Sequence, residues 1–280
     1  MRTIHVNKIV EAVAELCIEA NTFLAADIKE GITSASEKEV SPIGSAIFQN
    51  IEDNLNLAIN KKIPICQDTG MAVVFVTIGQ EVTIHGGSLS DAINDGVRKG
   101  YAEGYLRKSV VDDPLKRKNT DDNAPAVIHY DIVEGDRLHL LVMTKGFGSE
   151  NTSALAMLKP SDGEEGVKKF ILSTIEKGAP NACPPIVVGV GIGGTFEKAA
   201  LMAKEVLKLP LSQKNPDPYY ADMEADLIKR ANQMGIGPMG LGGINTVLGL
   251  HIATYPTHIA GLPVAINICC YLNRHGEREL

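Results

Sequence analysis

Segments with helical periodicity alternate with short strand-like runs along the whole chain, and this alternation constrains the fold more than any other feature. Apolar residues recur at helical spacing over residues 6–30, which predicts one or two amphipathic helices there. Further helices are predicted over 42–61, 89–106, 167–177, 196–207 and 219–234, with another helical stretch after Ser153. Strands are predicted over 72–78, 82–85, 126–133, 137–143, 186–190 and 263–270, and Glu134-Gly135-Asp136 is typical of a hairpin turn. The pattern predicts an α/β fold with a mixed sheet flanked by helices, as one domain or two closely packed lobes with the functional site between them.

Charge and hydropathy exclude several classes of function. The 280 residues include 27 Lys and Arg against 34 Asp and Glu, for a formal charge of −7, and no basic block stands out. This argues against a protein that neutralises nucleic-acid phosphates. No apolar run approaches the ~18–20 residues needed to span a bilayer. The N-terminal segment lacks the features of a signal peptide, so we expect a cytoplasmic protein that works on neither nucleic acid nor membrane.

Two glycine-rich runs fit the spacing of a dinucleotide-binding loop. They are Gly189-Val-Gly191-Ile-Gly193-Gly194 and Gly235-Ile-Gly237-Pro-Met-Gly240. Such a site also needs a second strand that ends in Asp or Glu about 20 residues later. Neither run is followed by one, which argues against a nicotinamide site. Two roles remain open for these glycines: close packing of backbones, or N–H groups that cradle an anion.

The five cysteines fall into two kinds of surroundings. Because their number is odd and no secretory signal is present, we expect reduced thiols rather than a disulfide framework. Cys17 lies in the apolar stripe of the first helix and is expected in the core. Cys66, Cys183 and Cys270 each lie where a strand meets a loop, beside Gly, Pro or polar residues. They are either isolated structural thiols or, if they converge, ligands of one metal site.

Three converging thiolates would have a specific chemical meaning. A cubane [4Fe–4S] cluster has four irons that each take one protein ligand, so three cysteines leave one iron open. An open iron is a Lewis acid, not an electron relay. Such an iron suits the addition or removal of water across a carbon–carbon double bond next to a carboxylate.

Several motifs occur together and in a fixed order along nearly the whole chain. They are Cys66-Gln-Asp-Thr-Gly70, Lys145-Gly-x-Gly-Ser-Glu-Asn151, Ala182-Cys-Pro-Pro185, Gly191-x-Gly-Gly-Thr195, and His258-Ile-Ala-Gly-Leu-Pro-Val-Ala265 followed by Cys270-x-x-x-Arg274-His275. This set resembles the iron–sulfur-dependent (class I) fumarate hydratases and L-tartrate dehydratases. The chain is most similar to the separate alpha subunit of the two-subunit forms. The resemblance implies one alpha domain over residues 1–280 and a separate beta subunit that carries the remaining catalytic domain.

The resemblance also implies a set of site residues. Cys66, Cys183 and Cys270 would be the three ligands of a [4Fe–4S] cluster that leaves one iron without a protein ligand. Cys269 would be a bystander, because neighbouring residues of a strand point to opposite faces. The residues implied to contact substrate are Gln67, Asp68, Arg107, Lys145, Gly146, Gly148 and His258. Asp68 would orient or deprotonate water, although the Thr-Gly that follows also fits a turn-capping aspartate.

The implied activity is that of a hydro-lyase that interconverts fumarate and (S)-malate. The alternative within the family is dehydration of L(+)-tartrate to oxaloacetate, and a more distant one is a non-catalytic metal-binding subunit. The implied partners are a small dicarboxylate substrate and the beta subunit. An alpha2beta2 assembly or an alpha homodimer is expected.

Overall fold

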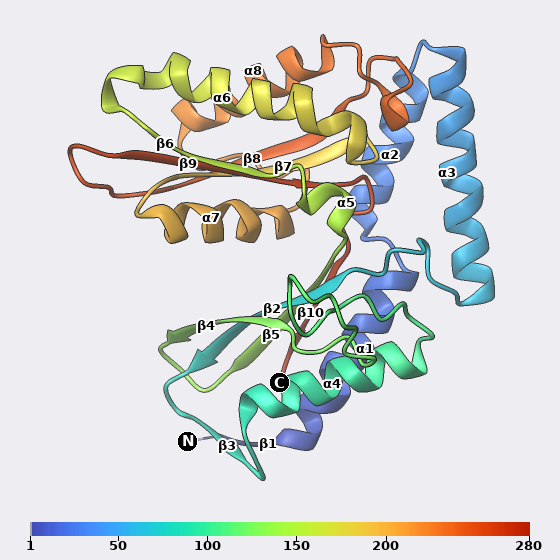
Figure 1. Ribbon diagram of the computed structural model, residues 1–280, viewed down its shortest axis with the longest axis vertical. Helices are drawn as coiled ribbons and strands as arrows, with labels where there is room; N and C mark the ends of the chain where they lie inside the picture. The colour runs from blue at the N-terminus through green and yellow to red at the C-terminus, as the bar shows by residue number, and fades with distance from the viewer. Residues whose placement is uncertain (1) are drawn as a thin grey trace. The chain divides into compact units, whose positions relative to one another are not determined.

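The computed structural model describes residues 2–280, which form two units. Unit 1 comprises residues 2–25, Asn54–Phe147 and Arg274–Leu280, and unit 2 comprises Ala26–Asp53 and Gly148–Asn273. Each unit has its own sheet (Figure 1). Each also has its own hydrophobic core. Among the described helices, none combines the length and the apolar character that crossing a membrane requires. The α/β class with mixed sheets flanked by helices is confirmed.

Unit 1 is built on a four-stranded sheet with the order β10-β5-β2-β4. Helices α1 and α4 pack against each other, and their apolar residues join those of the sheet in one core. A short parallel pair, β1 and β3, completes the unit. Its elements are β1 (Arg2–His5), α1 (Val6–Thr22), β2 (Met71–Gly79), β3 (Val82–His85), α4 (Leu89–Glu103), β4 (Val127–Val133), β5 (Leu138–Lys145) and β10 (His275–Glu279).

Unit 2 contains a second four-stranded sheet with the order β6-β9-β7-β8, covered by helices on both faces (Figure 1). Helices α6 and α8 contribute to the main core on one face, and α7 packs on the other through small residues. Its elements are α2 (Ala26–Lys38), β6 (Ala154–Leu158), α6 (Gly163–Gly178), β7 (Ile186–Gly193), α7 (Phe196–Glu205), α8 (Pro218–Asn232), β8 (Val247–Tyr255) and β9 (Leu262–Cys269). The chain passes from one unit to the other at four points, of which two lie in α3 (Pro42–Lys61) and α5 (Phe147–Glu150).

Strand pairing corrects two of the predictions. The predicted hairpin at Glu134-Gly135-Asp136 is wrong, because β2 lies between β4 and β5 in the sheet. The turn instead wraps around the end of β2: Gln80 N–H donates to the Val133 carbonyl and Glu81 N–H to the Gly135 carbonyl. The helical stretch predicted after Ser153 is also wrong. Its short apolar run forms β6, which pairs antiparallel with β9.

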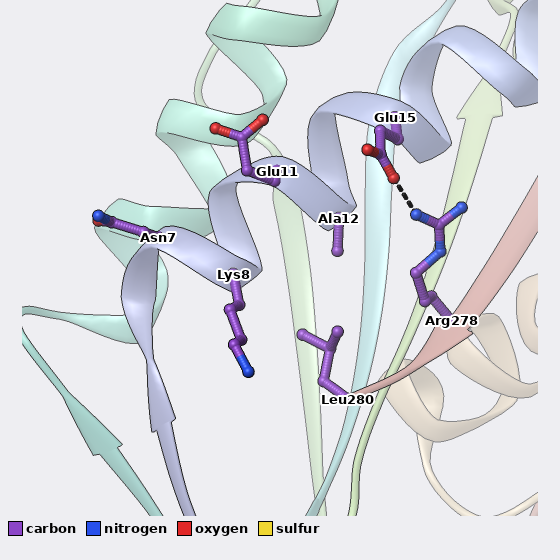
Figure 2. Close-up of a pocket in the computed structure, with 7 residues that line it drawn as sticks. All are labelled: Asn7, Lys8, Glu11, Ala12, Glu15, Arg278 and Leu280. Carbon is purple, nitrogen blue, oxygen red and sulfur yellow. Dashed lines mark hydrogen bonds and ion pairs between the residues drawn. The ribbon is translucent and has the colours of Figure 1, made fainter.

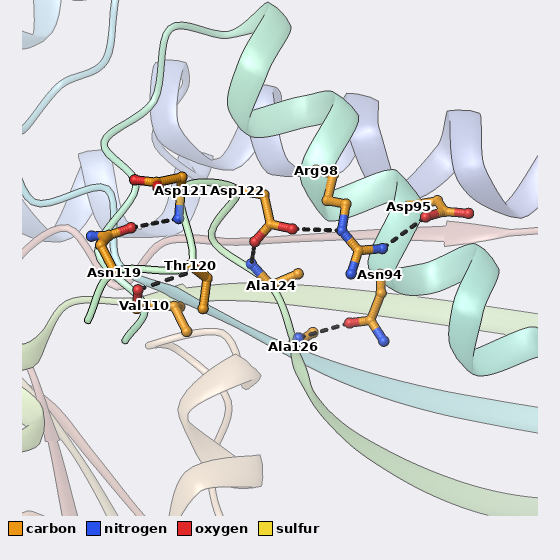
Figure 3. Close-up of polar contacts among 10 residues, drawn as sticks. All are labelled: Asn94, Asp95, Arg98, Val110, Asn119, Thr120, Asp121, Asp122, Ala124 and Ala126. Atoms are coloured by element: carbon orange, nitrogen blue, oxygen red, sulfur yellow. Dashed lines mark hydrogen bonds and ion pairs between the residues drawn. The ribbon is translucent and has the colours of Figure 1, made fainter. Parts of the chain in front are cut away.

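The long polar segment between α4 and β4 forms a loop with mostly exposed side chains. Its carboxylates and amides bond mainly to nearby backbone and to α4 (Figure 3). Asp122 accepts from Arg98 Nε at 2.7 Å and from Ala124 N–H at 2.9 Å. Asn94 of α4 accepts from Ala126 N–H at 2.8 Å, which fixes the point where β4 begins.

The first glycine run serves packing. A Cβ added to Gly189 would lie 1.9 Å from the Ala203 carbonyl oxygen, and one added to Gly191 would lie 2.1 Å from the Ala199 carbonyl oxygen. Both glycines are buried in β7, and α7 rests directly on their backbone. Of the two roles that the sequence left open, close packing is the one that the structure shows for this run.

Candidate active site

The loop from Cys66 to Gly70 precedes β2 in unit 1 and is fixed from several sides. The Tyr101 hydroxyl of α4 lies 2.8 and 2.9 Å from the carbonyl oxygens of Thr69 and Gly70. Asn123 donates to the same Gly70 carbonyl at 3.2 Å. Burial raises the pKa of Tyr101, so its hydroxyl stays a hydrogen-bond donor. The loop therefore has a defined conformation, as an active-site loop requires.

Asp68 is held in one orientation by two backbone donors, one on each carboxylate oxygen. Gly70 N–H donates to Oδ1 and Phe147 N–H donates to Oδ2, both at 3.0 Å. Gly146 permits this approach, since a Cβ there would lie 3.0 Å from Asp68 Oδ2 and 3.3 Å from Arg274 Nη2. A carboxylate and a guanidinium thus lie on the same side of the Gly146 backbone.

Arg274 lies beside Gly146, although the sequence motifs assign it no role. Its side chain is only 4% exposed, and its Nη1 donates to Asn21 Oδ1 at 2.9 Å. Asn21 is itself fully buried at the end of α1 and donates to the Cys17 carbonyl. A buried arginine needs such partners, because an unpaired buried charge is very costly. The signal for Arg274 in the sequence was its place in the Arg-His pair after Cys270.

The remaining predicted substrate residues differ in their surroundings. Lys145, at the end of β5, is almost fully buried, and Gly146 follows it. Gln67 and Arg107 are exposed in unit 1, where the Arg107 N–H and carbonyl both bond to the Thr69 hydroxyl. Gly148 and His258 belong to unit 2. Their convergence with Asp68 stays a prediction.

The three predicted ligand cysteines belong to different units. Cys66 is half-buried in the Asp68 loop of unit 1. Cys183 and Cys270 lie in unit 2, where Tyr271 N–H donates to the Cys183 carbonyl at 3.4 Å, so these two turns lie together. Within either unit, no three described His, Cys, Asp or Glu side chains group closely enough to hold one metal ion. A shared site would need thiols from both units.

The five thiols differ in their burial. Cys17 is fully buried, and burial raises the pKa of its thiol to about 12, which disfavours the thiolate that metals bind. Cys269 is 4% exposed and is the last residue of β9. Cys66 and Cys270 are half-buried and Cys183 is exposed. Cys66, Cys183 and Cys270 are thus the three cysteines that are not buried, and their role as cluster ligands stays a prediction.

The second glycine run packs against the turn that carries Cys183. Met239 N–H donates to the Pro184 carbonyl at 2.8 Å, and a Cβ on Gly240 would lie 3.2 Å from Pro180. The Glu39 carboxylate binds the far end of this loop. It accepts hydrogen bonds from Ile244 N–H at 3.2 Å and from the Asn245 side chain at 2.7 Å. Glu39 thus helps to hold the loop on which the Cys183 turn rests.

Replacing Glu39 with glutamine is expected to lower the free energy of unfolding by about 1–2 kcal/mol, because a charged acceptor is lost. Burial alone would raise the pKa of Glu39, but hydrogen bonds from Ser41, Asn245, Ile244 and Val40 outweigh it and lower this pKa. The stabilisation is therefore fully present at neutral pH and is lost as the pH falls through the lowered pKa.

Thermal melts of the two proteins from pH 7 to pH 3 measure this effect. The difference in melting temperature should be largest near neutrality and should close below about pH 4. Glu37→Gln, an exposed position two residues earlier at the end of α2, is the matched control and should melt like the parent at every pH. A difference for Glu39→Gln that does not change with pH would contradict the assignment.

Two pockets lie away from these residues. One of about 350 Å³ in unit 1 is shown in Figure 2, where Glu15 pairs with Arg278. Its lining residues are Asn7, Lys8, Glu11, Ala12, Glu15, Arg278 and Leu280. The other, of about 290 Å³, lies in unit 2 beside Tyr219 and Tyr220. None of the predicted site residues lines either pocket, so the candidate site rests on the hydrogen-bonded loops described above.

Comparison with known proteins identifies relatives along nearly the whole length. The profile of the family described as fumarate hydratase (Fumerase) matches residues 10–279. A Methanocaldococcus jannaschii protein, provisionally named L(+)-tartrate dehydratase subunit alpha, is 39% identical over 98% of both chains. The L(+)-tartrate dehydratase alpha subunits of Escherichia coli K12 and Shigella sonnei are each 33% identical over 97% of this chain and 90% of their own. The resemblance drawn from the motifs is confirmed: the chain belongs to the fumarate hydratase (Fumerase) family.

Proposed function

We propose that this chain is the alpha subunit of a [4Fe–4S]-dependent hydro-lyase that reversibly hydrates fumarate to (S)-malate. The observation that carries the proposal is the fixed orientation of the Asp68 carboxylate, which lies beside the buried Arg274. Asp68 belongs to the same loop as Cys66. Membership of the fumarate hydratase family and relatives named as dehydratase subunits support the same class of reaction.

Hydration adds a hydroxyl group to one alkene carbon and a proton to the other. In this proposal Asp68 accepts the proton that the attacking water loses. The two backbone donors that orient its oxygens support this role. The Arg274 guanidinium suits a planar substrate carboxylate. Gln67, Arg107, Lys145, Gly146, Gly148 and His258 complete the proposed substrate-binding set. When bound, a cluster held by Cys66, Cys183 and Cys270 would supply a Lewis-acid iron.

The second candidate is dehydration of L(+)-tartrate to oxaloacetate. The names of the relatives favour it, since those described above are named as subunits of L(+)-tartrate dehydratase. The same carboxylate, guanidinium and cluster would serve either reaction. The two substrates differ in the number of hydroxyl groups, so kcat/KM for fumarate and for L(+)-tartrate, measured on one preparation, decides between them.

The chain alone is expected to turn over neither substrate at an appreciable rate. Trans addition of water needs a proton-transfer group on each face of the double bond, and we propose that the second group belongs to a beta subunit. Absence of one such group costs on the order of 10²–10⁴ in rate.

Anaerobic assays of the reconstituted chain, with and without a co-expressed beta subunit, test this dependence. Turnover of fumarate or tartrate only in the complex would support the proposal. Full hydratase activity of the purified chain alone would contradict the need for a partner, whereas activity of the complex on neither substrate would contradict the proposed function itself.

A further inference from the structure

The strand β4 lies at the border of its sheet and leaves one edge without a strand partner among residues 2–280. The sheet order is β10-β5-β2-β4, and β4 pairs in parallel with β2 alone (Figure 1). Four of its side chains are exposed apolar ones: Val127, Tyr130, Ile132 and Val133. Exposed edge strands are usually protected by Lys, Pro or a bulge. Residues 127–133 contain neither Lys nor Pro, and the pairing with β2 is regular.

The sequence of β4 is nearly palindromic. It reads Val127-Ile-His-Tyr130-Asp-Ile-Val133, so the order of side-chain types is the same in both directions except that His129 faces Asp131 across the centre. If two copies of this strand pair antiparallel about Tyr130, valine lies opposite valine and isoleucine opposite isoleucine. Each His129 then lies opposite the Asp131 of the other copy. Cross-strand pairs of this kind stabilise antiparallel sheets.

The geometry of a two-fold axis allows few registers. An antiparallel pair of identical strands has its axis perpendicular to the sheet, which keeps each face of the sheet on the same side in both copies. Residues that lie opposite each other must therefore point to the same face. Because side chains alternate between faces along a strand, this holds only when the axis passes at a residue and not between two residues. An axis at Asp131 would place Asp131 opposite itself, and one at His129 would place His129 opposite itself. Only the register about Tyr130 pairs His129 with Asp131.

Contacts with α4 and β2 also fix the conformation of β4. The hydroxyls of Tyr130 and Ser90 of α4 lie 2.8 Å apart, and Asn94 of α4 accepts from Ala126 N–H. The His129 ring stacks on Phe75 of β2 at a centroid distance of 5.2 Å. These contacts fix the strand before a partner arrives, which lowers the entropy cost of association.

We propose that two copies of this chain associate through β4, antiparallel about Tyr130, and join their two four-stranded sheets into one continuous sheet. The occupant of this edge is a second copy because the strand is complementary to itself in apolar side chains and in charge. The inference does not depend on the proposed activity. A contact of one short strand is small, so we expect a dissociation constant in the micromolar range, about 1–100 μM.

Sedimentation equilibrium of the full-length, reduced chain measures the association. Ile132→Lys should raise the dissociation constant at least about tenfold, because the exposed Ile132 loses its apolar partner at the interface. Leu115→Lys is the matched control: Leu115 is also exposed, but it lies in the loop before β4, and this variant should associate like the parent. Equal association of the two variants, or a parent chain that is monomeric at 200 μM, would overturn the proposal.

Thiol cross-linking tests the register. In the proposed pairing two Tyr130→Cys residues lie directly opposite each other, about 5 Å apart, whereas two Ile132→Cys residues are four positions out of register, about 13 Å apart. A short thiol cross-linker should therefore join the first variant and not the second, with the parent chain as the measure of background from the native cysteines.

Equal cross-linking of both variants would overturn the register. A third result is also decisive: if the chain alone is monomeric and Ile132→Lys instead abolishes binding of a beta subunit, the edge belongs to that partner and the proposed self-association is wrong.

Discussion

Alanine in place of Cys66, Cys183 or Cys270 is expected to abolish assembly of the proposed iron–sulfur cluster. Each of these thiols would hold one iron, and a cubane with only two protein thiolates loses its anchorage. After anaerobic reconstitution with iron and sulfide, the parent chain should bind about four irons and absorb broadly near roughly 400 nm. Each variant should lose most of the iron and of this absorbance while keeping its melting temperature within a few degrees.

Two cysteines of the same chain provide the controls. Cys17 lies in the hydrophobic core of unit 1, and Cys269 is a buried residue of β9. Cys17→Ala and Cys269→Ala should therefore reduce stability and leave the cluster intact. One group of variants should thus lose the cluster and keep its stability, and the other should lose stability and keep the cluster. A normal cluster in Cys183→Ala, or loss of the cluster in a folded Cys269→Ala protein, would remove the basis of the proposed cofactor.

The sequence predicts most helices and buried strands of this fold, because their periodicity is set by the faces that they bury. The prediction fails where pairing between distant strands decides the secondary structure. The run after Ser153 is short and apolar, and only its pairing with β9 makes it a strand. The hairpin at Glu134–Asp136 has suitable turn residues, yet β2 lies between the strands that it joins. Local turn chemistry carries no information about an intervening strand.

The residues of the candidate site also fall into those that the sequence motifs locate and those that they miss. Motifs locate Asp68, Gly146 and the cysteines, because these residues lie in short segments with unusual composition. They do not reveal Asn21, which ends an ordinary amphipathic helix and supports Arg274 from a distance of some 250 positions in the chain. They also miss Tyr101 and Glu39, whose partners are backbone groups of loops remote in sequence. Supporting residues of this kind carry no local signature.

Asp68→Asn is expected to reduce kcat of the assembled enzyme on the order of 10²–10⁴-fold, the usual contribution of a positioned general base. An amide cannot accept the proton, and it also disturbs the local bonding. Gly70 N–H and Phe147 N–H donate to different oxygens of Asp68, so an asparagine NH₂ group must face one of these two donors. The clash adds about 1–3 kcal/mol of local destabilisation to the chemical defect.

Asp113→Asn is the control for a change from carboxylate to amide at a position without a proposed role in the reaction. Asp113 also accepts two backbone N–H groups, from Leu115 and Lys116, but both reach the same oxygen, so asparagine can keep both bonds. This control should retain full activity and the parent melting temperature. Asp68→Asn should retain the absorbance of the cluster while turnover is lost, because an amide cannot take up the proton. If Asp68→Asn instead keeps more than about a tenth of the parental kcat, the carboxylate acts only as a turn cap.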